Sequence, residues 1–327
     1  MKTVKVGIVG CGYFGNFHLN NLQKIDGVEV VALSSFNSAK LKTTGEKVPG
    51  AHLYSSHREM FEKEKQLDAL FICVPPDSHD DVEILAAKKG IHIYVEKPIG
   101  LSMHKAEDIE SAVNAAGIIS CVGYQERYND EVEKIKDYIS NKKIGLVNAR
   151  WITGMPGIPW WRMKERSGGQ IVEQCTHLID MLRYLIGDIN LVYSLAGKGL
   201  MQNIPEYNID DYTSTILKFK SGVIASVVTA CYLENNTNFN GISFQIVCND
   251  TVIEYDWDKE LRYITEDSIK KVEFNGSSHL KAAETFIEAI RTGRPEIIKS
   301  PYSDAVKTLR ATLATNESIT SAMPIIF

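Results

Sequence analysis

The residues GCGYFG at 10–15 match the pattern G-x-G-x-x-G and directly follow an apolar run, VKVGIVG at 4–10. In dinucleotide-binding loops of this pattern, Gly10 permits the tight turn, Gly12 lets the backbone approach a pyrophosphate, and Gly15 lets the next helix pack closely on the strand. The N-terminus of that helix would face the negative charge. The strand, turn and helix context favours a nucleotide site over a glycine-rich turn without a ligand.

The residues after the second apolar run favour NADP over NAD. NAD-binding chains place Asp or Glu at the end of the second strand, where it holds the ribose 2′-hydroxyl. Here that place is taken by Ser34, Ser35, Phe36 and Asn37, with Lys40 one helical turn further on. No carboxylate would repel a 2′-phosphate, and the serines could donate hydrogen bonds to it. Because no arginine stands beside the serines, NAD stays open as the alternative cofactor.

Lys97 is a candidate catalytic residue. It comes at the end of the apolar run IHIYVE at 91–96, between Glu96 and Pro98. In open α/β sheets ligands bind outside the carboxyl ends of the strands, and a proline biases the preceding residue away from helical geometry. A lysine at that edge could stabilise a substrate oxygen or move a proton, with Glu96 holding it in place. A surface lysine that ends a strand is the alternative interpretation.

A second candidate group lies in a predicted helix at 170–186. Glu173, His177 and Asp180 are spaced i, i+4 and i+7, which puts them on one face of a helix. His177 could act as a general base oriented by Glu173. The same face could bind a divalent metal, or it could be a hydrogen-bonded surface without chemistry. The cysteines and remaining histidines show no zinc-ligand spacing, so we expect no metal.

The elements that must position these residues can be predicted up to residue 123. Short apolar runs lie at 4–10, 28–34, 67–74, 91–96 and 118–123. Helix-like segments separate them, such as 77–89, which ends before Gly90. Near-continuous apolar strands that alternate with helices indicate a parallel sheet covered on both faces. We therefore assign residues 1–123 to a doubly wound, Rossmann-type α/β domain that binds NAD(P).

Residues 124–327 are predicted to form a second, α+β domain for substrate binding and oligomerisation. Alternating strands without intervening helices lie at 212–219, 222–232, 242–249 and 251–257, and helices at 278–291 and 302–322 close the chain. This pattern indicates an open, mainly antiparallel sheet. Both faces of this sheet look partly apolar, and the helices at 170–186 and 278–291 can cover only one of them. We therefore expect a homodimer or homotetramer through this sheet.

The composition excludes several classes of protein. The 327 residues are 44% hydrophobic and 24% charged, as in ordinary two-domain globular proteins. No apolar run approaches the ~20 residues of a membrane span, and the start of the chain lacks the cleavage site of an export signal, so we expect a cytoplasmic protein. The net charge of −5 without a basic run argues against general nucleic-acid binding. The six dispersed cysteines argue against a disulfide scaffold.

Taken together, four motifs in this order resemble the glucose-fructose oxidoreductase and inositol dehydrogenase (Gfo/Idh/MocA) family. They are the glycine loop, Val74-Pro75-Pro76 with His79 close behind, Glu96-Lys97-Pro98, and SGGQIVEQCTHLID at 167–180. The resemblance covers essentially the whole chain. It implies that Lys97 lies in the active site beside the nicotinamide. The implied cofactor contacts are Gly10, Gly12, Tyr13, Phe14, Gly15, Ser34, Ser35, Lys40, Val74, Pro75, His79, Glu96, Lys97 and Gln125.

The resemblance also implies roles in the second domain. In the family, an acid and a histidine at the positions of Glu173 and His177 take the proton of the substrate hydroxyl, although the acid is usually Asp. Asp180 falls on an aspartate that we interpret as structural. Contacts to the substrate are predicted for Tyr124, Arg127, Trp161 and Arg162, because Trp161 could stack on a sugar and Arg162 could bind hydroxyl or carboxylate groups. Packing of the tryptophans against the second sheet or another subunit is the alternative.

These observations predict an NAD(P)-dependent oxidoreductase that transfers hydride between the nicotinamide and a secondary hydroxyl or ketone of a sugar, cyclitol or related polyol. Two alternatives remain. One is a sensor or regulatory protein that binds NADP without turnover, against which the presence of both Lys97 and His177 argues. The other is a reductase of a non-carbohydrate substrate on the same scaffold.

Overall fold

The computed structural model of the chain describes residues 3–327 except for residues 202, 235–238, 240 and 275–276. The chain divides into two compact units. The first unit holds residues 1–128 and 277–306, and the second holds residues 129–276 and 307–327. The sequence predicted one boundary near residue 123, but the chain passes between the units three times.

The first unit is built on a six-stranded parallel sheet. Its strands are β1 Val4–Val9, β2 Val28–Ser34, β3 His52–Tyr54, β4 Ala69–Ile72, β5 His92–Val95 and β6 Ser120–Val122. Their order is β3-β2-β1-β4-β5-β6, so the direction in which strands are added reverses between β1 and β4. This confirms the predicted Rossmann-type sheet, in which ligands bind at the carboxyl ends of the strands at that reversal.

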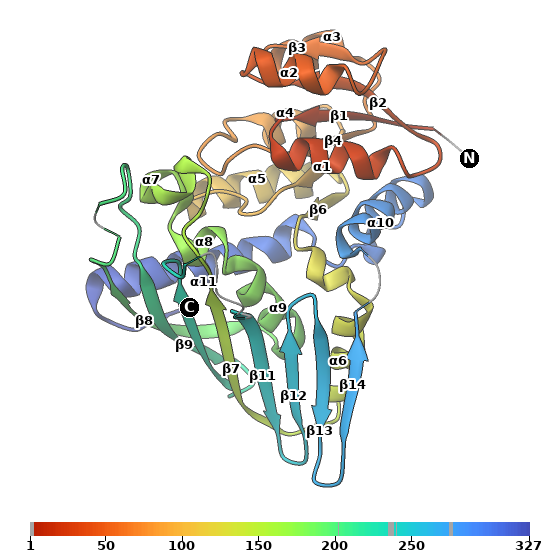
Figure 1. Cartoon of the computed structure of the whole chain (residues 1–327). Helices are drawn as coiled ribbons and strands as arrows, with labels where there is room; N and C mark the ends of the chain where they lie inside the picture. Colours follow the sequence, from red (N-terminus) through yellow and green to blue (C-terminus); the bar gives the residue numbers. More distant parts are fainter. Residues whose placement is uncertain (1–2, 202, 235–238, 240, 275–276) are drawn as a thin grey trace. The chain divides into compact units, whose positions relative to one another are not determined.

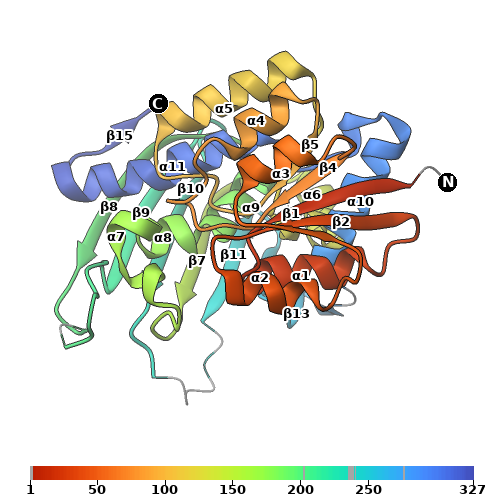
Figure 2. The ribbon, with the colours of Figure 1, turned by 90° about the horizontal axis from the view of Figure 1, so that it is seen from above.

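Helices cover both faces of this sheet. They are α1 Tyr13–Leu22, α2 Ser38–Gly45, α3 His57–Lys63, α4 Val82–Lys88, α5 Met103–Ala116, η1 Gln125–Tyr128, α10 Ser278–Thr292 and η3 Pro295–Ile297. Figure 2 shows α1 and α2 on one side of the strands and α4 and α5 on the other. Because both faces are covered, β4 is buried at every residue and β1 at all but one, which explains their near-continuous apolar sequences.

The helix α10 belongs to the first unit, which corrects its assignment to the second domain. Ala282, Ala283, Phe286 and Ile287 lie on one face of α10 and share a buried cluster with residues of β1 and β4. α10 also contacts α1 and η1. The sequence predicted a helix at 278–291, which the structure confirms, but it could not show which sheet this helix would meet.

The second unit is built on a nine-stranded sheet in the order β14-β13-β12-β11-β7-β10-β9-β8-β15. Its strands are β7 Ile144–Ile152, β8 Ile189–Gly197, β9 Tyr212–Phe219, β10 Ile224–Ala230, β11 Ile242–Cys248, β12 Val252–Asp256, β13 Glu260–Ile264, β14 Ile269–Glu273 and β15 Ile325–Ile326. All neighbouring strands run antiparallel except β7 and β10, which are parallel. The prediction of a mainly antiparallel sheet is therefore confirmed.

Helices cover one face of the nine-stranded sheet. The helical segments of this unit are α6 Asp130–Ile139, η2 Pro159–Arg162, α7 Lys164–Ser167, α8 Gln170–Glu173, α9 Thr176–Ile186 and the part of α11 Tyr302–Ser321 that follows residue 306. Ile135 of α6, Leu182 of α9 and Ala311 of α11 share a buried cluster with the inward-facing Leu217 and Val227. Figure 1 shows α9 behind the strands of this sheet. Among the described residues, no helix is long and apolar enough to cross a bilayer.

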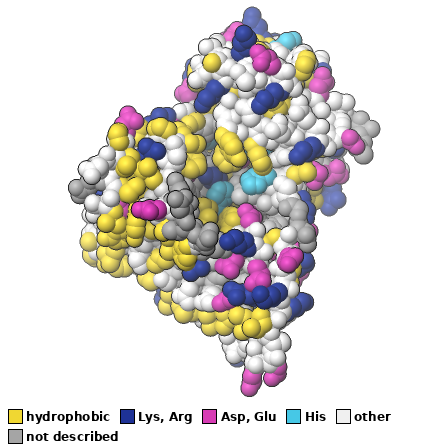
Figure 3. Space-filling view, viewed as in Figure 1, with side chains coloured by type: hydrophobic (Ala, Val, Ile, Leu, Met, Phe, Trp, Pro, Cys, Tyr) yellow, Lys and Arg dark blue, Asp and Glu magenta, His cyan; other side chains and the backbone are white. Residues whose placement is uncertain are grey.

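The opposite face of the nine-stranded sheet, which we call the open face, stays exposed or half-buried. Strand pairing aligns one apolar residue from each of six neighbouring strands in a continuous row. The row consists of Ile224, Leu146, Val247, Val252, Ile264 and Ile269. Figure 3 shows further hydrophobic side chains over β8 and β9, and charged side chains over β12 and β13. The open face is therefore more apolar than a surface that only meets water.

Candidate active site

The glycine loop between β1 and α1 has the geometry of a phosphate-binding turn. Gly10 has a φ of +99°, and a Cβ there would lie 2.4 Å from the carbonyl oxygen of Cys73. A Cβ on Gly15 would lie 1.8 Å from the carbonyl oxygen of Gly10, so only glycine lets α1 pack this closely. Nothing lies within 4 Å of a Cβ built on Gly12. Because the first turn of α1 also lacks an acidic residue, the loop fits the pyrophosphate of a dinucleotide.

Several residues predicted to contact the cofactor lie at one edge of the parallel sheet. They follow the adjacent strands β1, β4 and β5, whose carboxyl ends share that edge. The residues are Gly10, Gly12, Tyr13, Phe14, Gly15, Val74, Pro75, Glu96 and Lys97. Tyr13 is exposed, whereas Phe14, Val74 and Pro75 are half-buried. The edge therefore offers a glycine loop, apolar contacts, a carboxylate and a lysine to one ligand.

The end of β2 offers few polar groups to a ribose. Ser34 is buried, and its carbonyl oxygen accepts a hydrogen bond from the N–H of Gly10 at 2.8 Å. The Asn37 side chain caps α2 by accepting a hydrogen bond from the N–H of Lys40 at 2.9 Å. Ser35 is half-buried, and the Lys40 side chain is exposed. Of the predicted contacts here, Ser35 and Lys40 are thus the most accessible.

Lys97 lies beside a buried carboxylate. Lys97 is only 9% exposed, and its backbone N–H donates a hydrogen bond to Oε2 of Glu96 at 3.3 Å. Oε1 of Glu96 accepts a hydrogen bond from Nε2 of His18 at 2.6 Å. Burial acts to raise the pKa of Glu96, but the interactions with His18 and then Lys97 hold this pKa below its usual range. Glu96 is therefore ionised at neutral pH and supplies a negative charge beside Lys97.

His79, a predicted cofactor contact, is buried in the first unit. It is 1% exposed, and its Nδ1 contacts the carboxylate of Glu83 in α4. Pairs of histidine and acid four residues apart meet on one side of a helical turn. The structure thus gives His79 a role in holding the start of α4, which the sequence did not predict.

The residues after β6 are also buried. Tyr124 and Gln125 are 2% and 6% exposed. Arg127 is 3% exposed, donates to the carbonyl oxygen of Lys299 at 2.7 Å and forms an ion pair with Asp304. Arg127 is a predicted substrate contact, and in the structure its guanidinium already binds two residues of the same unit. A motif cannot show such partners, because they lie more than 170 residues away in the sequence.

The predicted helix at 170–186 is interrupted in the structure. α8 ends at Glu173 and α9 begins at Thr176. The N–H of Cys175 donates to the carbonyl oxygen of Gln170, five residues back, at 2.9 Å, which makes this turn wider than an α-helical turn. The prediction of one continuous helix over 170–186 is therefore wrong, because the interruption falls between Glu173 and His177.

Two tryptophans that the sequence analysis missed surround His177. The ring of Trp151 in β7 is nearly parallel to the imidazole at 6.1 Å, and the ring of Trp257 is edge-on at 6.2 Å. His177 is half-buried. The two indoles limit the orientations that the imidazole can adopt, as a general base requires. The alternation of β7 could have shown that Trp151 faces inward, but the partner of its ring depends on the fold.

The other predicted polar residues of the second unit have partners as well. Asp180 is buried and accepts a hydrogen bond from Oγ1 of Thr308 at 2.7 Å. Arg162 in η2 donates from Nε to the carbonyl oxygen of Pro156 at 2.9 Å. Trp161 is half-buried and lies edge-on to Trp160. The residues of η2 are accessible enough to meet a ligand.

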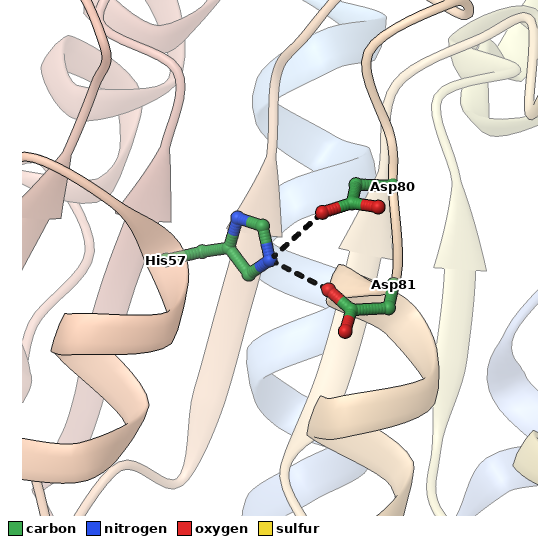
Figure 4. Close-up of side chains that lie close together, drawn as sticks. All are labelled: His57, Asp80 and Asp81. Carbon is green, nitrogen blue, oxygen red and sulfur yellow. Dashed lines mark hydrogen bonds and ion pairs between the residues drawn. The ribbon is translucent and has the colours of Figure 1, made fainter.

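One group among the described residues places a histidine and two carboxylates close enough to share an ion. His57, Asp80 and Asp81 offer ligand atoms within 4.8 Å of one another, and Figure 4 shows both carboxylates pointing toward the imidazole. Arg58 also forms ion pairs with Asp80 at 3.1 Å and Asp81 at 2.9 Å. Since the guanidinium neutralises these carboxylates and would repel a cation, we interpret the group as an ion-pair network.

Comparison with known protein families agrees with this geometry. Residues 4–124 match the model of the oxidoreductase family with an NAD-binding Rossmann fold, GFO_IDH_MocA. Residues 132–254 match the GFO/IDH/MocA C-terminal domain. Each of the two family models covers a large part of one unit, and together they match more than half of the chain.

Individual relatives extend over almost the whole chain. The myo-inositol 2-dehydrogenase of Thermotoga maritima is 26% identical over 307 residues, which is 90% of each protein. An oxidoreductase from Agrobacterium radiobacter, solved with NAD+, L-tartaric acid and magnesium, has a TM-score of 0.88 at 16% identity and covers 99% of this chain and 98% of its own. Levoglucosan dehydrogenase, solved with NADH and levoglucosan, has a TM-score of 0.86 at 19% identity, with 99% of both chains covered. The two structures show a shared fold.

Proposed function

We propose that this chain, which belongs to the GFO/IDH/MocA family of NAD-binding oxidoreductases, is an NAD(P)-dependent dehydrogenase of a sugar, cyclitol or related polyol. The observation that carries the proposal is the position of Lys97, which follows β5 next to an ionised carboxylate, at the edge of the sheet where the glycine loop also lies. The names of the relatives support the substrate class, since they include an inositol dehydrogenase and a levoglucosan dehydrogenase.

The reaction requires removal of a proton and a hydride from one carbon. The nicotinamide, when bound, accepts the hydride. His177 is the proposed base that takes the hydroxyl proton, and Glu173 is the proposed orienting acid. Lys97 is proposed to donate a hydrogen bond to the substrate oxygen and to stabilise the negative charge that develops on it. We retain Trp161 and Arg162 as proposed substrate contacts, because both belong to the accessible segment η2.

We further propose that NADP is preferred over NAD. A 2′-phosphate at the end of β2 would meet the Ser35 hydroxyl and the exposed Lys40 ammonium, and residues 34–40 contain no carboxylate that would repel it. Binding of both cofactors measured by calorimetry tests this preference.

Steady-state assays test the activity itself. A panel containing myo-inositol, scyllo-inositol, glucose and levoglucosan should be assayed with both cofactors. With the best substrate, Lys97→Ala and His177→Ala should each lower kcat by about 10² or more, the range for loss of a general acid or base. Lys105→Ala and His104→Ala change exposed residues of α5 and serve as controls that keep wild-type turnover. Near-wild-type turnover in Lys97→Ala would remove Lys97 from the mechanism.

The same assays distinguish the proposed dehydrogenase from the two alternative functions. A sensor would bind the cofactor with ordinary affinity but oxidise or reduce no member of the panel. A reductase of a non-carbohydrate substrate would also convert no sugar or cyclitol of the panel, but it would consume NADPH with simple ketones or aldehydes. Such ketones and aldehydes should therefore be included in the assays.

We also propose that two copies of the chain pack through the open face. The row from Ile224 to Ile269 runs across six strands, and Leu146 within it is 42% exposed. The adjacent positions carry both Glu254 and Arg262, so a second copy related by a two-fold axis could meet them with complementary charge. Two sheets can pack face to face in this way about 10 Å apart.

Light scattering behind a sizing column tests this assembly. The wild type should elute with at least twice the 36.6 kDa of one chain, and Leu146→Asp should shift it toward the monomer. Leu53→Asp is a matched control, because Leu53 is a similarly exposed leucine on β3 of the first unit. A monomeric wild type would show that the open face needs no second copy.

A further inference from the structure

The environment of Glu96 contains a histidine that none of the proposed roles uses. His18 lies in α1 three residues after the glycine motif, and it is fully buried. Its imidazole packs against the rings of Phe71 and Tyr94 at 5.3 and 4.9 Å, and its Nε2 lies 2.6 Å from Oε1 of Glu96. A polar ring in an apolar core is costly unless it is hydrogen-bonded, so this bond accounts for its presence there.

The hydrogen bond fixes which nitrogen of His18 carries the proton. The Glu96 carboxylate can only accept, so Nε2 must donate. Nδ1 is buried and has no hydrogen-bond partner among the described residues. We therefore assign a hydrogen to Nε2, so that the ring is a donor toward Glu96.

The surrounding backbone leaves space for this carboxylate. A Cβ built on Gly123 would lie 2.8 Å from Oε1 of Glu96 and 2.9 Å from Oε2. Glycine at 123 therefore lets the carboxylate sit against the chain that follows β6. Together with His18 on one side and the N–H of Lys97 on the other, this arrangement holds both oxygens of Glu96 in defined positions.

We propose that His18 is a positioning residue, which holds the buried Glu96 carboxylate ionised and in place so that it serves as a fixed negative charge for the Lys97 ammonium. This inference rests on the proposed function only in its consequence for catalysis. The link between His18, Glu96 and Lys97 holds whether or not Lys97 takes part in turnover.

The charge of Glu96 depends on groups from every element around it. Besides His18 of α1 and the adjacent Lys97, the titratable groups that interact with it are Cys73 after β4, Tyr94 of β5, Cys121 of β6 and His279 of α10. Burial raises the pKa values of Cys73, Tyr94 and Cys121, so these three are neutral near pH 7. Burial lowers the pKa of His279, so it adds little positive charge there.

Removal of His18 therefore has a consequence with a defined sign. Without its hydrogen bond, burial dominates and the pKa of Glu96 rises toward neutral. In a His18→Leu variant Glu96 would then be protonated in the weakly acidic range, where it is ionised in the wild type. Lys97 would lose a counter-charge at low pH and regain it as the pH rises.

Acetylation of Lys97 by acetic anhydride, followed by mass spectrometry, measures this effect without a substrate. Loss of a neighbouring negative charge makes a lysine release its proton more easily, and the free amine is the reactive form. At pH 6 Lys97 of His18→Leu should react at least about threefold faster than Lys97 of the wild type, because a larger fraction of its amine is in the free form. At pH 9 the two rates should agree within about twofold, because Glu96 is ionised in both.

Further variants separate this role from packing. His18→Gln keeps a donor and should restore most of the wild-type labelling. Glu96→Gln removes the charge directly and should speed labelling at both pH values. His57→Leu deletes another buried histidine of the same unit that is bonded to a carboxylate, Asp81, and should leave Lys97 unchanged.

A ratio of labelling rates for His18→Leu that does not change between pH 6 and pH 9 would overturn the proposal, because a general loss of packing acts at every pH. If His18→Leu does not fold, Glu96→Gln decides, and wild-type labelling in that variant is equally fatal. Wild-type turnover of Lys97→Ala would instead overturn the proposed catalytic role and leave the labelling result standing.

Discussion

The two sheets of this protein hold their candidate functional groups in different places. The parallel sheet of the first unit is covered on both faces, and its candidate groups lie where β1, β4 and β5 end. The nine-stranded sheet of the second unit is covered on one face, and its candidate groups lie in the segments η2, α8 and α9. Strand order fixes the first set, whereas local hydrogen bonding within a helix fixes the second. The difference explains why the two sets were not equally predictable.

The largest expected effect concerns the two faces of the second sheet. Leu217 and Ile216 are neighbours in β9, but Leu217 is fully buried and Ile216 is 38% exposed on the open face. Leu217→Ala should lower the free energy of unfolding by about 2–5 kcal/mol, the range for a leucine removed from a packed core. Ile216→Ala should cost less. Urea unfolding followed by circular dichroism measures both.

The dependence on protein concentration sharpens this test. If a second copy covers the open face, the loss in Ile216→Ala should grow with protein concentration, because association stabilises the folded chain by mass action. The loss in Leu217→Ala should not. If the loss in Ile216→Ala is also independent of protein concentration, no second copy covers the open face.

The next effect concerns the glycine loop of the first unit. Gly12→Val should weaken cofactor binding by at least about 10², or about 2.7 kcal/mol, because the new side chain fills the space at the N-terminus of α1. The fold should survive, since nothing lies within 4 Å of a Cβ at Gly12. Gly145→Val in β7 is a matched control, because Gly145 has the same free space in the other unit. Calorimetry with NADP and NAD compares the three proteins.

The smallest effect concerns the end of β2. Ser35→Asp should move the cofactor preference toward NAD by about tenfold, or about 1.4 kcal/mol, because a carboxylate accepts from the ribose 2′-hydroxyl and repels a 2′-phosphate. Thr43→Asp adds the same charge at an exposed position of α2 and should change the preference much less. A wild type that already prefers NAD tenfold would contradict the proposed cofactor preference.

The sequence predicted those features that depend on neighbouring residues. The glycine loop, the parallel strands and the helix α10 follow from local patterns, and the structure has all three. The position of Lys97 at a strand end also followed, because proline limits the conformation of the residue before it. Local patterns were thus sufficient wherever one short segment carries the whole signal.

The features that the sequence could not supply depend on distant partners or on one hydrogen bond. The substrate contact at Arg127 stays a prediction, but the binding of Arg127 to Lys299 and Asp304 could not be predicted from its motif. His18 carried no signal beyond its place after the glycine motif, because its partner Glu96 is 78 residues away. The wide turn at Cys175 was hidden, since no proline or glycine marks it.

The return of α10 to the first unit affects how the nascent chain can fold on the ribosome. Residues 1–128 emerge first, but the buried cluster of this unit also needs Phe286 and Ile287, which emerge only after all of residues 129–276. Until then, the apolar surface of α1 and β4 that α10 will cover remains exposed to other chains. The unit that begins synthesis is therefore among the last parts to become complete, and a chain stopped before α10 would be prone to aggregate.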